Sequence, residues 1–130
     1  MSGAGEVTRR SIGIVFADGG LLAIASSLPQ TGRGHGEEET TAVLCEQDGA
    51  PLAFEEALVS TEYGEDGVQR RVSLELWPDL EAVRPLRGAG TLINSVAVRR
   101  AGSEARIAFF RWNVEGREGL GHYEVARPVA

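Results

Sequence analysis

The stretch that most limits how this chain can fold is residues 107–127, IAFFRWNVEGREGLGHYEVAR. Apolar and aromatic residues fill its first part, a short turn with Gly116 follows, and a second extended run completes it. Two strand-forming runs around a tight, glycine-containing turn predict a β-hairpin. Gly119 and Gly121 lie inside the second run, where glycine weakens a strand. They predict a tight bend of the sheet, or the close approach of another backbone or a ligand.

The rest of the chain repeats this pattern of extended runs separated by turns. Pairs such as Asp48-Gly49 mark the turns. The run at residues 68–77 alternates, with Leu74 and Leu76 on one face and polar side chains on the other, which is the period of a half-buried strand. Strands are predicted at residues 11–17, 21–28, 40–47, 68–77, 88–100, 104–112 and 117–125.

Residues 51–63 fit two interpretations. Phe54 and Leu58 are four residues apart, which suits a helix, and the residues between them are helix formers. The segment lies between two turn signals in a chain of strands, however, and this context favours a strand.

With this strand included, the chain has about eight or nine strands joined by short connections. Their regular spacing predicts an all-β fold, and the simplest topology is an antiparallel up-and-down β-barrel. An eight-stranded barrel is just wide enough to be filled by side chains or to hold one small ligand. We expect residues 1–10 to be a flexible leader and residues 11–130 to form the single barrel domain. The polar, glycine-rich residues 29–39 are expected to form a solvated loop or a lid.

Composition excludes several classes of function. The formal net charge of −6 argues against a nucleic-acid partner, because such binding relies on basic groups that neutralise phosphates. No apolar run approaches the length of about 20 residues that spans a bilayer. Cys45 is the single cysteine, and the first residues lack the apolar core of a signal peptide, so a cytoplasmic location is expected.

The segment FRWNVEGREGLGHYE, residues 110–124, resembles the closing motif of the AttH-like and hydroxyneurosporene-synthase-like proteins. In that motif an aromatic strand precedes a Gly-Arg pair, a Gly-x-Gly and a glutamate. Gly116-Arg117, Gly119-Leu120-Gly121 and Glu124 match these positions.

The resemblance implies a lipocalin-like antiparallel barrel, in a family that includes hydratases and cyclases of polyene substrates. Members of that family typically carry two barrels, whereas this chain has the length for one. A homodimer that replaces the missing half, a ligand inside one barrel, and a loss of activity are the alternatives. We expect a homodimer that buries on the order of 1,200 Å² or more, with contacts near the ends of the meander.

Candidate catalytic residues are Glu124, Tyr123 and His122. If the face of Glu124 looks into the barrel, its carboxyl group would lie in an apolar cavity and could act as an acid, assisted by Tyr123 or His122. The alternative is a structural ion pair between Glu124 and Arg111 or Arg117. This enzymatic interpretation predicts isomerisation, hydration or cyclisation of an unsaturated apolar substrate.

Candidate ligand-binding residues are apolar. The expected ligand is a small apolar molecule of the terpenoid, polyketide or fatty-acid type, held in an apolar pocket with a few polar groups. A third interpretation is a non-catalytic interaction module, which a solid interior would favour. No metal site or cofactor is predicted, because His35 and its neighbouring glutamates do not fix a coordination geometry. The residues expected to line the pocket are Trp77, Phe110, Trp112 and Leu120.

Overall fold

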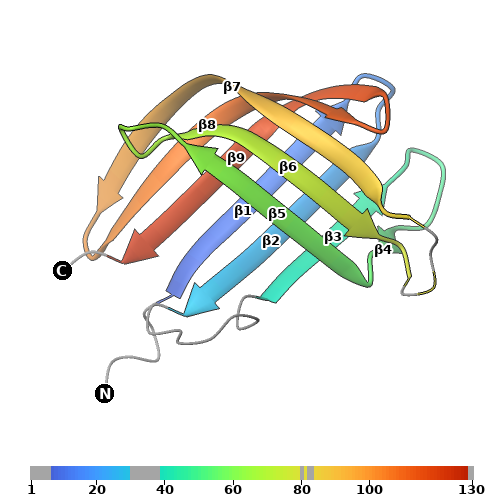
Figure 1. Ribbon diagram of the computed structural model, residues 1–130, viewed down its shortest axis with the longest axis horizontal. Helices are drawn as coiled ribbons and strands as arrows, with labels where there is room; N and C mark the ends of the chain where they lie inside the picture. The colour runs from blue at the N-terminus through green and yellow to red at the C-terminus, as the bar shows by residue number, and fades with distance from the viewer. Residues whose placement is uncertain (1–6, 30–38, 80, 82–83, 129–130) are drawn as a thin grey trace.

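The computed structural model describes residues 7–29, 39–79, 81 and 84–128. Every regular element within these residues is a β-strand, so the all-β prediction is confirmed (Figure 1). No helix in this part of the chain is long and apolar enough to cross a membrane. The strands are β1 (Val7–Phe16), β2 (Leu21–Pro29), β3 (Glu39–Cys45), β4 (Leu52–Ala53), β5 (Glu56–Tyr63), β6 (Gln69–Trp77), β7 (Leu86–Arg100), β8 (Ser103–Val114) and β9 (Arg117–Pro128).

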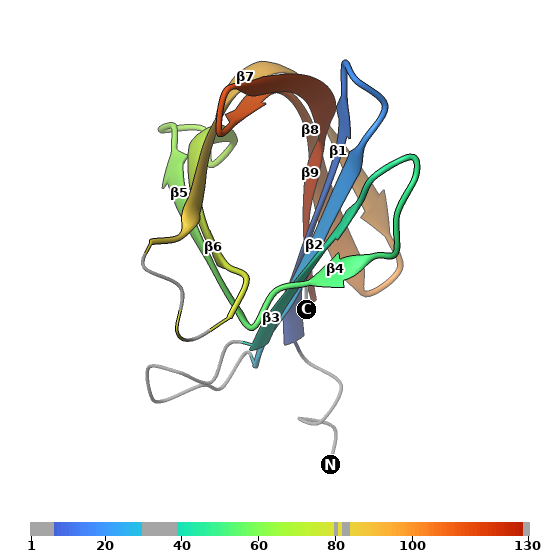
Figure 2. The same cartoon turned by 90° about the vertical axis from the view of Figure 1, so that its right-hand side faces the viewer.

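The nine strands form one antiparallel sheet in the order β4-β3-β2-β1-β9-β8-β7-β6-β5. The sheet curls strongly, so that β5 and β6 face β1 and β2 across the interior and the whole resembles a half-barrel (Figure 2). This architecture is consistent with a lipocalin-like barrel.

The first and last strands pair with each other in the middle of the sheet. β1 is antiparallel to β9 from Arg9 opposite Ala126 to Phe16 opposite Gly119. The prediction that the ends of the meander would be the open edges is therefore wrong: β4 and β5, from the middle of the chain, are the edge strands. The pairing of β1 with β9 satisfies backbone groups that would otherwise be open at both ends of the chain.

Residues 51–63 are extended, as the sequence context favoured, and they connect the two edges of the sheet. After β4 pairs with β3, the backbone N–H of Phe54 donates to the Ala42 carbonyl (3.0 Å). The next residue, Glu55, donates its N–H to the Trp77 carbonyl on β6 (2.8 Å). One short segment thus hydrogen-bonds first to β3 and then to β6, which draws the two edges together at this end of the half-barrel.

The inner glycines of the final hairpin mark a close approach of two backbones, as one of the sequence interpretations predicted. A Cβ atom added to Gly121 would collide with the carbonyl group of Gly13 on β1. At Gly90, on β7, an added Cβ would lie 2.6 Å from the Trp112 ring. These two positions lack side chains because another backbone or a large ring occupies the space.

A buried glutamine side chain bridges the sheet at the other end of the half-barrel. The register of β7 against β8 shifts between Leu92 and Asn94, and β6 pairs with β7 only as far as Arg71 opposite Thr91. Beyond this point the Gln69 side chain reaches from β6 to β9, where its Nε2 donates to the Tyr123 carbonyl (3.1 Å). Gln69 is fully buried, so this side chain links β6 to β9 across the interior, and its Oε1 has no hydrogen-bond partner among the described residues.

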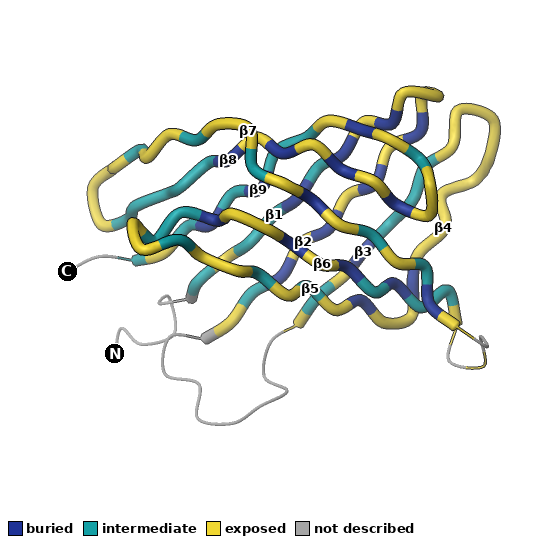
Figure 3. Tube along the Cα trace, turned by 45° about the horizontal axis from the view of Figure 1, so that its top comes forward, coloured by how far each residue is buried: buried dark blue, intermediate teal, exposed yellow. Residues whose placement is uncertain are grey.

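The concave face of the sheet carries the core, as the alternation of buried and exposed residues along each strand shows (Figure 3). Side chains alternate across a strand, so the partners of these core residues point outward. Strand β1 begins at Val7 rather than at Ser11, so residues 7–10 belong to the sheet and not to a leader. Residues 1–6 and most of the loop at 29–39 lie outside the described residues. The largest fully buried side chains are Trp112, Tyr123, Phe110, Ile14, Leu22, Leu74, Leu76, Gln69, Val72 and Val125.

Candidate functional site

The three candidate catalytic residues of β9 do not lie on one face. Tyr123 points into the half-barrel and is fully buried. His122 and Glu124, its neighbours in the strand, point to the outer face and are half-buried. Tyr123 and Glu124 therefore lie on opposite sides of a single sheet and cannot act on the same molecule, whereas His122 shares the outer face with Glu124.

Aromatic side chains fill the interior. Phe110 and Trp112 project inward from β8 with ring centroids 5.2 Å apart, and Tyr123 approaches Phe110 at 6.0 Å. The expectation that Phe110 and Trp112 point together, with Phe109 on the opposite face, is confirmed. These rings pack against one another and the surrounding aliphatic core instead of framing an empty space.

The phenol of Tyr123 is a polar group within this interior. It shares a hydrogen bond of 2.7 Å with the Thr61 hydroxyl on β5, and Arg10 Nη1 donates to it at 3.3 Å. Burial raises the pKa of Tyr123, and the hydrogen bond with Thr61 opposes that rise. A neutral phenol between two polar groups links β9 to β1 and to β5, which ties the two halves of the curled sheet together.

Glu124 lies on the outer face, opposite Ser11 on β1 and Ile107 on β8. The condition under which it would act as an acid, a position in the apolar interior, is not met. The expected alternative, an ion pair with Arg111 or Arg117, is not formed among the described residues either, and Arg117 binds other carboxylates.

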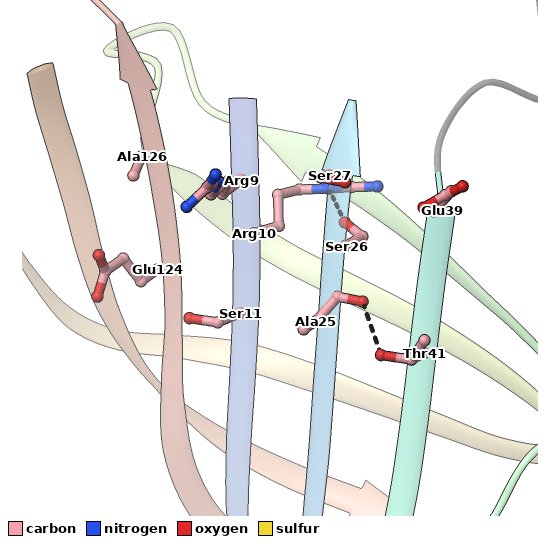
Figure 4. A pocket seen from close by; sticks show the side chains of 10 residues that line it. All are labelled: Arg9, Arg10, Ser11, Ala25, Ser26, Ser27, Glu39, Thr41, Glu124 and Ala126. Atoms are coloured by element: carbon pink, nitrogen blue, oxygen red, sulfur yellow. Dashed lines mark hydrogen bonds between the residues drawn. The ribbon is translucent and has the colours of Figure 1, made fainter. Parts of the chain in front are cut away.

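An open depression of about 560 Å³ surrounds Glu124 on the outer face (Figure 4). It lies over β3, β2, β1 and β9, where small side chains such as Ser11 and Ala25 leave the sheet uncovered. Thr41 donates to the Ala25 carbonyl within it at 3.5 Å. The depression is open to solvent, and Glu124 stands at its margin beside Ala126.

Arg117 organises the strongest charge cluster among the described residues. Its guanidinium binds Asp18 and Glu46, with shortest distances of 2.8 and 3.0 Å, and lies 4.4 Å from the centre of the Phe16 ring. Hydrogen bonding to Arg117 lowers the pKa of Asp18, and the same bonds raise the pKa of Arg117. Because the cluster joins the β1–β2, β3–β4 and β8–β9 turns, it is a structural clamp at one end of the sheet.

The outer face also carries exposed apolar side chains on its inner strands. Four of them lie on the adjacent strands β2, β1, β9 and β8, and we call these four the outer strip. Leu120 is 58% exposed and Val15, directly opposite it on β1, is 59% exposed. An open depression of about 520 Å³ lies between them, and Arg111 and Glu118 stand at its margin. The outer strip consists of Leu21, Val15, Leu120 and Phe109.

The four predicted ligand-binding residues are thus divided between the two faces. Phe110 and Trp112 belong to the core, whereas Leu120 lies in the outer strip. Trp77 alternates with the fully buried Leu76, so it also lies on the outer face. The prediction missed Val15 as an exposed apolar residue, although its alternation with Ile14 and Phe16 could have revealed it.

Within the described residues, no group of three or more His, Cys, Asp or Glu side chains is arranged to hold a metal ion. His35, Glu37 and Glu38 lie outside that part of the chain. The chain matches no protein-family model, no curated protein and no solved structure.

Proposed function

We propose that this protein is a non-catalytic interaction module that forms a homodimer through the outer strip. One observation carries the proposal: the interior is occupied by packed side chains, while four large apolar residues are exposed on neighbouring strands of the outer face. A contiguous exposed apolar patch on a soluble protein marks an interaction site.

The contrast between the two faces supports this assignment. On the concave side, Trp112, Phe110 and Tyr123 are at most 1% exposed. On the convex side, Phe109 is 53% exposed although it comes from the same strand as Phe110. Burial of such side chains in an interface is favourable by about 25 cal/mol per Å² of apolar surface removed from water. A second copy of the chain presents the same strip, so a twofold dimer buries both.

Replacement of Leu120 with Asp tests the proposal. Sedimentation velocity at micromolar concentration should show the parent protein at twice its 13.9 kDa monomer mass and the variant at the monomer mass. Leu58→Asp is the matched control, because Leu58 is 48% exposed on the edge strand β5, away from the strip. A parent protein that sediments at 13.9 kDa, or a Leu120 variant that stays dimeric, would overturn the proposal.

A small apolar ligand is the second candidate, and the depression between Val15 and Leu120 favours it. Terpenoid, polyketide or fatty-acid-like molecules would bind there on the outer face and not inside the half-barrel. Native mass spectrometry with a panel of these compounds should detect a one-to-one complex that Leu120→Asp abolishes. A complex that survives this substitution would place the ligand elsewhere.

A further inference from the structure

We infer that two copies of the chain associate in one particular twofold register, in which Arg111 of each copy pairs with Glu118 of the other. This inference rests on the proposed function, because it specifies the arrangement of the same outer strip. It makes Arg111 and Glu118 the residues that determine which surface the strip accepts.

Arg111 and Glu118 flank Leu120 on the outer face. Arg111 is directly opposite Leu120 on β8, and Glu118 precedes Leu120 by two residues on β9, so all three side chains point the same way. Both charged residues are exposed. Neither forms an ion pair with another of the described residues, unlike Arg117 nearby. They are therefore available for a charge partner on a second molecule.

Strand geometry fixes where a twofold axis must lie to pair these two charges between copies. Neighbouring strands are about 4.8 Å apart, and two residues along a strand span about 7 Å. In face-to-face packing, the twofold axis lies in the contact plane. An axis that brings Arg111 onto Glu118 of the second copy must bisect the line between these two residues at a right angle.

That axis passes close to the centre of the outer strip. Arg111 pairs with Leu120, and Leu120 pairs with Val15, which fixes the relative positions of these residues on the sheet. With these positions, the axis runs within about 2 Å of both Leu120 and Val15. Each of these apolar side chains then meets its own copy across the axis. One twofold rotation thus forms two Arg111–Glu118 pairs and buries the two most exposed residues of the outer strip.

The same operation gives Leu21 a place on the second copy. Leu21 lies opposite Val15 on the far side of β1, and the axis brings it over Gly13. Gly13 has no side chain of its own, and the ring of His122 lies over it, with Cε1 2.9 Å from where a Cβ would be. A leucine from the second copy would therefore pack on the imidazole ring that covers Gly13.

Charge reversal in two separate variants tests the register. Arg111→Glu places like charges opposite Glu118, and Glu118→Arg places like charges opposite Arg111. Each variant alone should dimerise at least about tenfold more weakly than the parent, because like charges across an interface are strongly unfavourable. Arg71→Glu on β6 is the matched control and should leave the dimer dissociation constant unchanged.

Mixing the two variants gives the decisive result. In the mixed dimer both contacts become opposite-charge pairs again, so a heterodimer should form with an affinity within about threefold of the parent dimer. Fluorescence energy transfer between a donor-labelled and an acceptor-labelled variant measures it. No heterodimer above the level of the single variants would overturn the register.

The outcomes separate this inference from the proposed function. If Leu120→Asp produces monomers but neither charge reversal changes the dissociation constant, the strip is an interface in a different register. If the parent protein itself is a monomer, both the proposed function and the register are wrong. Because exposed charges are replaced, folding of each variant is checked by circular dichroism before the binding measurement.

Discussion

The close approach of β1 and β9 predicts that Gly121→Ala destabilises the protein. In an ordinary strand this substitution is favourable by about 0.5–1 kcal/mol, because glycine loses more conformational freedom on folding. At position 121 the added methyl group would occupy the space of the Gly13 carbonyl. That carbonyl belongs to the backbone of the neighbouring strand, so the methyl group cannot be accommodated by rotating a side chain.

The magnitude follows from what must move. Overpacking at a rigid site costs about 1–3 kcal/mol, and displacement of β1 weakens ladder hydrogen bonds that contribute about 1 kcal/mol each. The free energy of unfolding should therefore fall by about 3 kcal/mol. For a domain of 130 residues this corresponds to a decrease in Tm of roughly 12 °C.

Thermal and urea unfolding followed by circular dichroism measure this change. Gly49→Ala is the matched control, since it adds the same methyl group where no atom lies within 4 Å. That control should change the free energy of unfolding by less than about 1 kcal/mol. If Gly121→Ala unfolds at the parent temperature, the backbones of β1 and β9 do not approach each other as described.

Three other predictions concern the polar contacts of the two faces. Tyr123→Phe should lower the free energy of unfolding by about 1–2 kcal/mol, since it leaves Thr61 without its buried partner. Tyr63→Phe, at an exposed tyrosine, should not lower it, and equal effects of the two substitutions would contradict a stabilising role of the Tyr123–Thr61 hydrogen bond. Because the pKa of Tyr123 is raised in the folded state, its contribution to stability is complete below about pH 10, the unfolded value, and is lost as the pH rises through the folded value. In the Tyr63→Phe variant Tyr123 is the one remaining tyrosine, so absorbance at 295 nm should show ionisation above about pH 10, and ionisation at or below that pH would refute this. The lowered pKa of Asp18 has the opposite consequence: its pairing with Arg117 stabilises the fold above about pH 4 and is lost as the pH falls through the pKa of Asp18 in the folded state. Asp18→Asn should therefore reduce the loss of stability at acidic pH, and an unchanged loss would show that the pair contributes nothing.

The strands were predictable from sequence because alternation and turn residues are local signals. The period-two pattern of residues 68–77 and the Asp-Gly turns can be recognised from a few neighbouring residues in the sequence. The structure contains the corresponding strands. The two glycines of β9 also carried a correct signal, since only a close backbone approach explains Gly121.

The faces and edges of the sheet were not predictable in the same way. Alternation shows that Tyr123 and Glu124 point in opposite directions, but it does not show which direction is inward. That depends on which strands the sheet brings together, and the pairing of β1 with β9 joins residues more than 100 positions apart. The condition that the face of Glu124 looks into the barrel could not be decided from the sequence for this reason.

Residues 7–10 illustrate a second limit. Thr8, Arg9 and Arg10 are polar and have no apolar alternation, so they were assigned to a flexible leader. In the structure Arg10 pairs with Ser26 on one side and Val125 on the other, so long-range pairing overrides the local pattern.

The pairing of the first strand with the last determines when the protein can fold during its synthesis. β9 is synthesised more than 100 residues after its partner β1. Until then β1–β4 have only one another, as a small sheet whose apolar inner face, including Ile12 and Ile14, lacks the strands that cover it. Contacts of such long sequence separation also form slowly, because chain closure must precede them. Strands β1–β4 therefore expose an aggregation-prone surface until β9 has been translated, and a chaperone that holds this surface should increase the yield of folded protein.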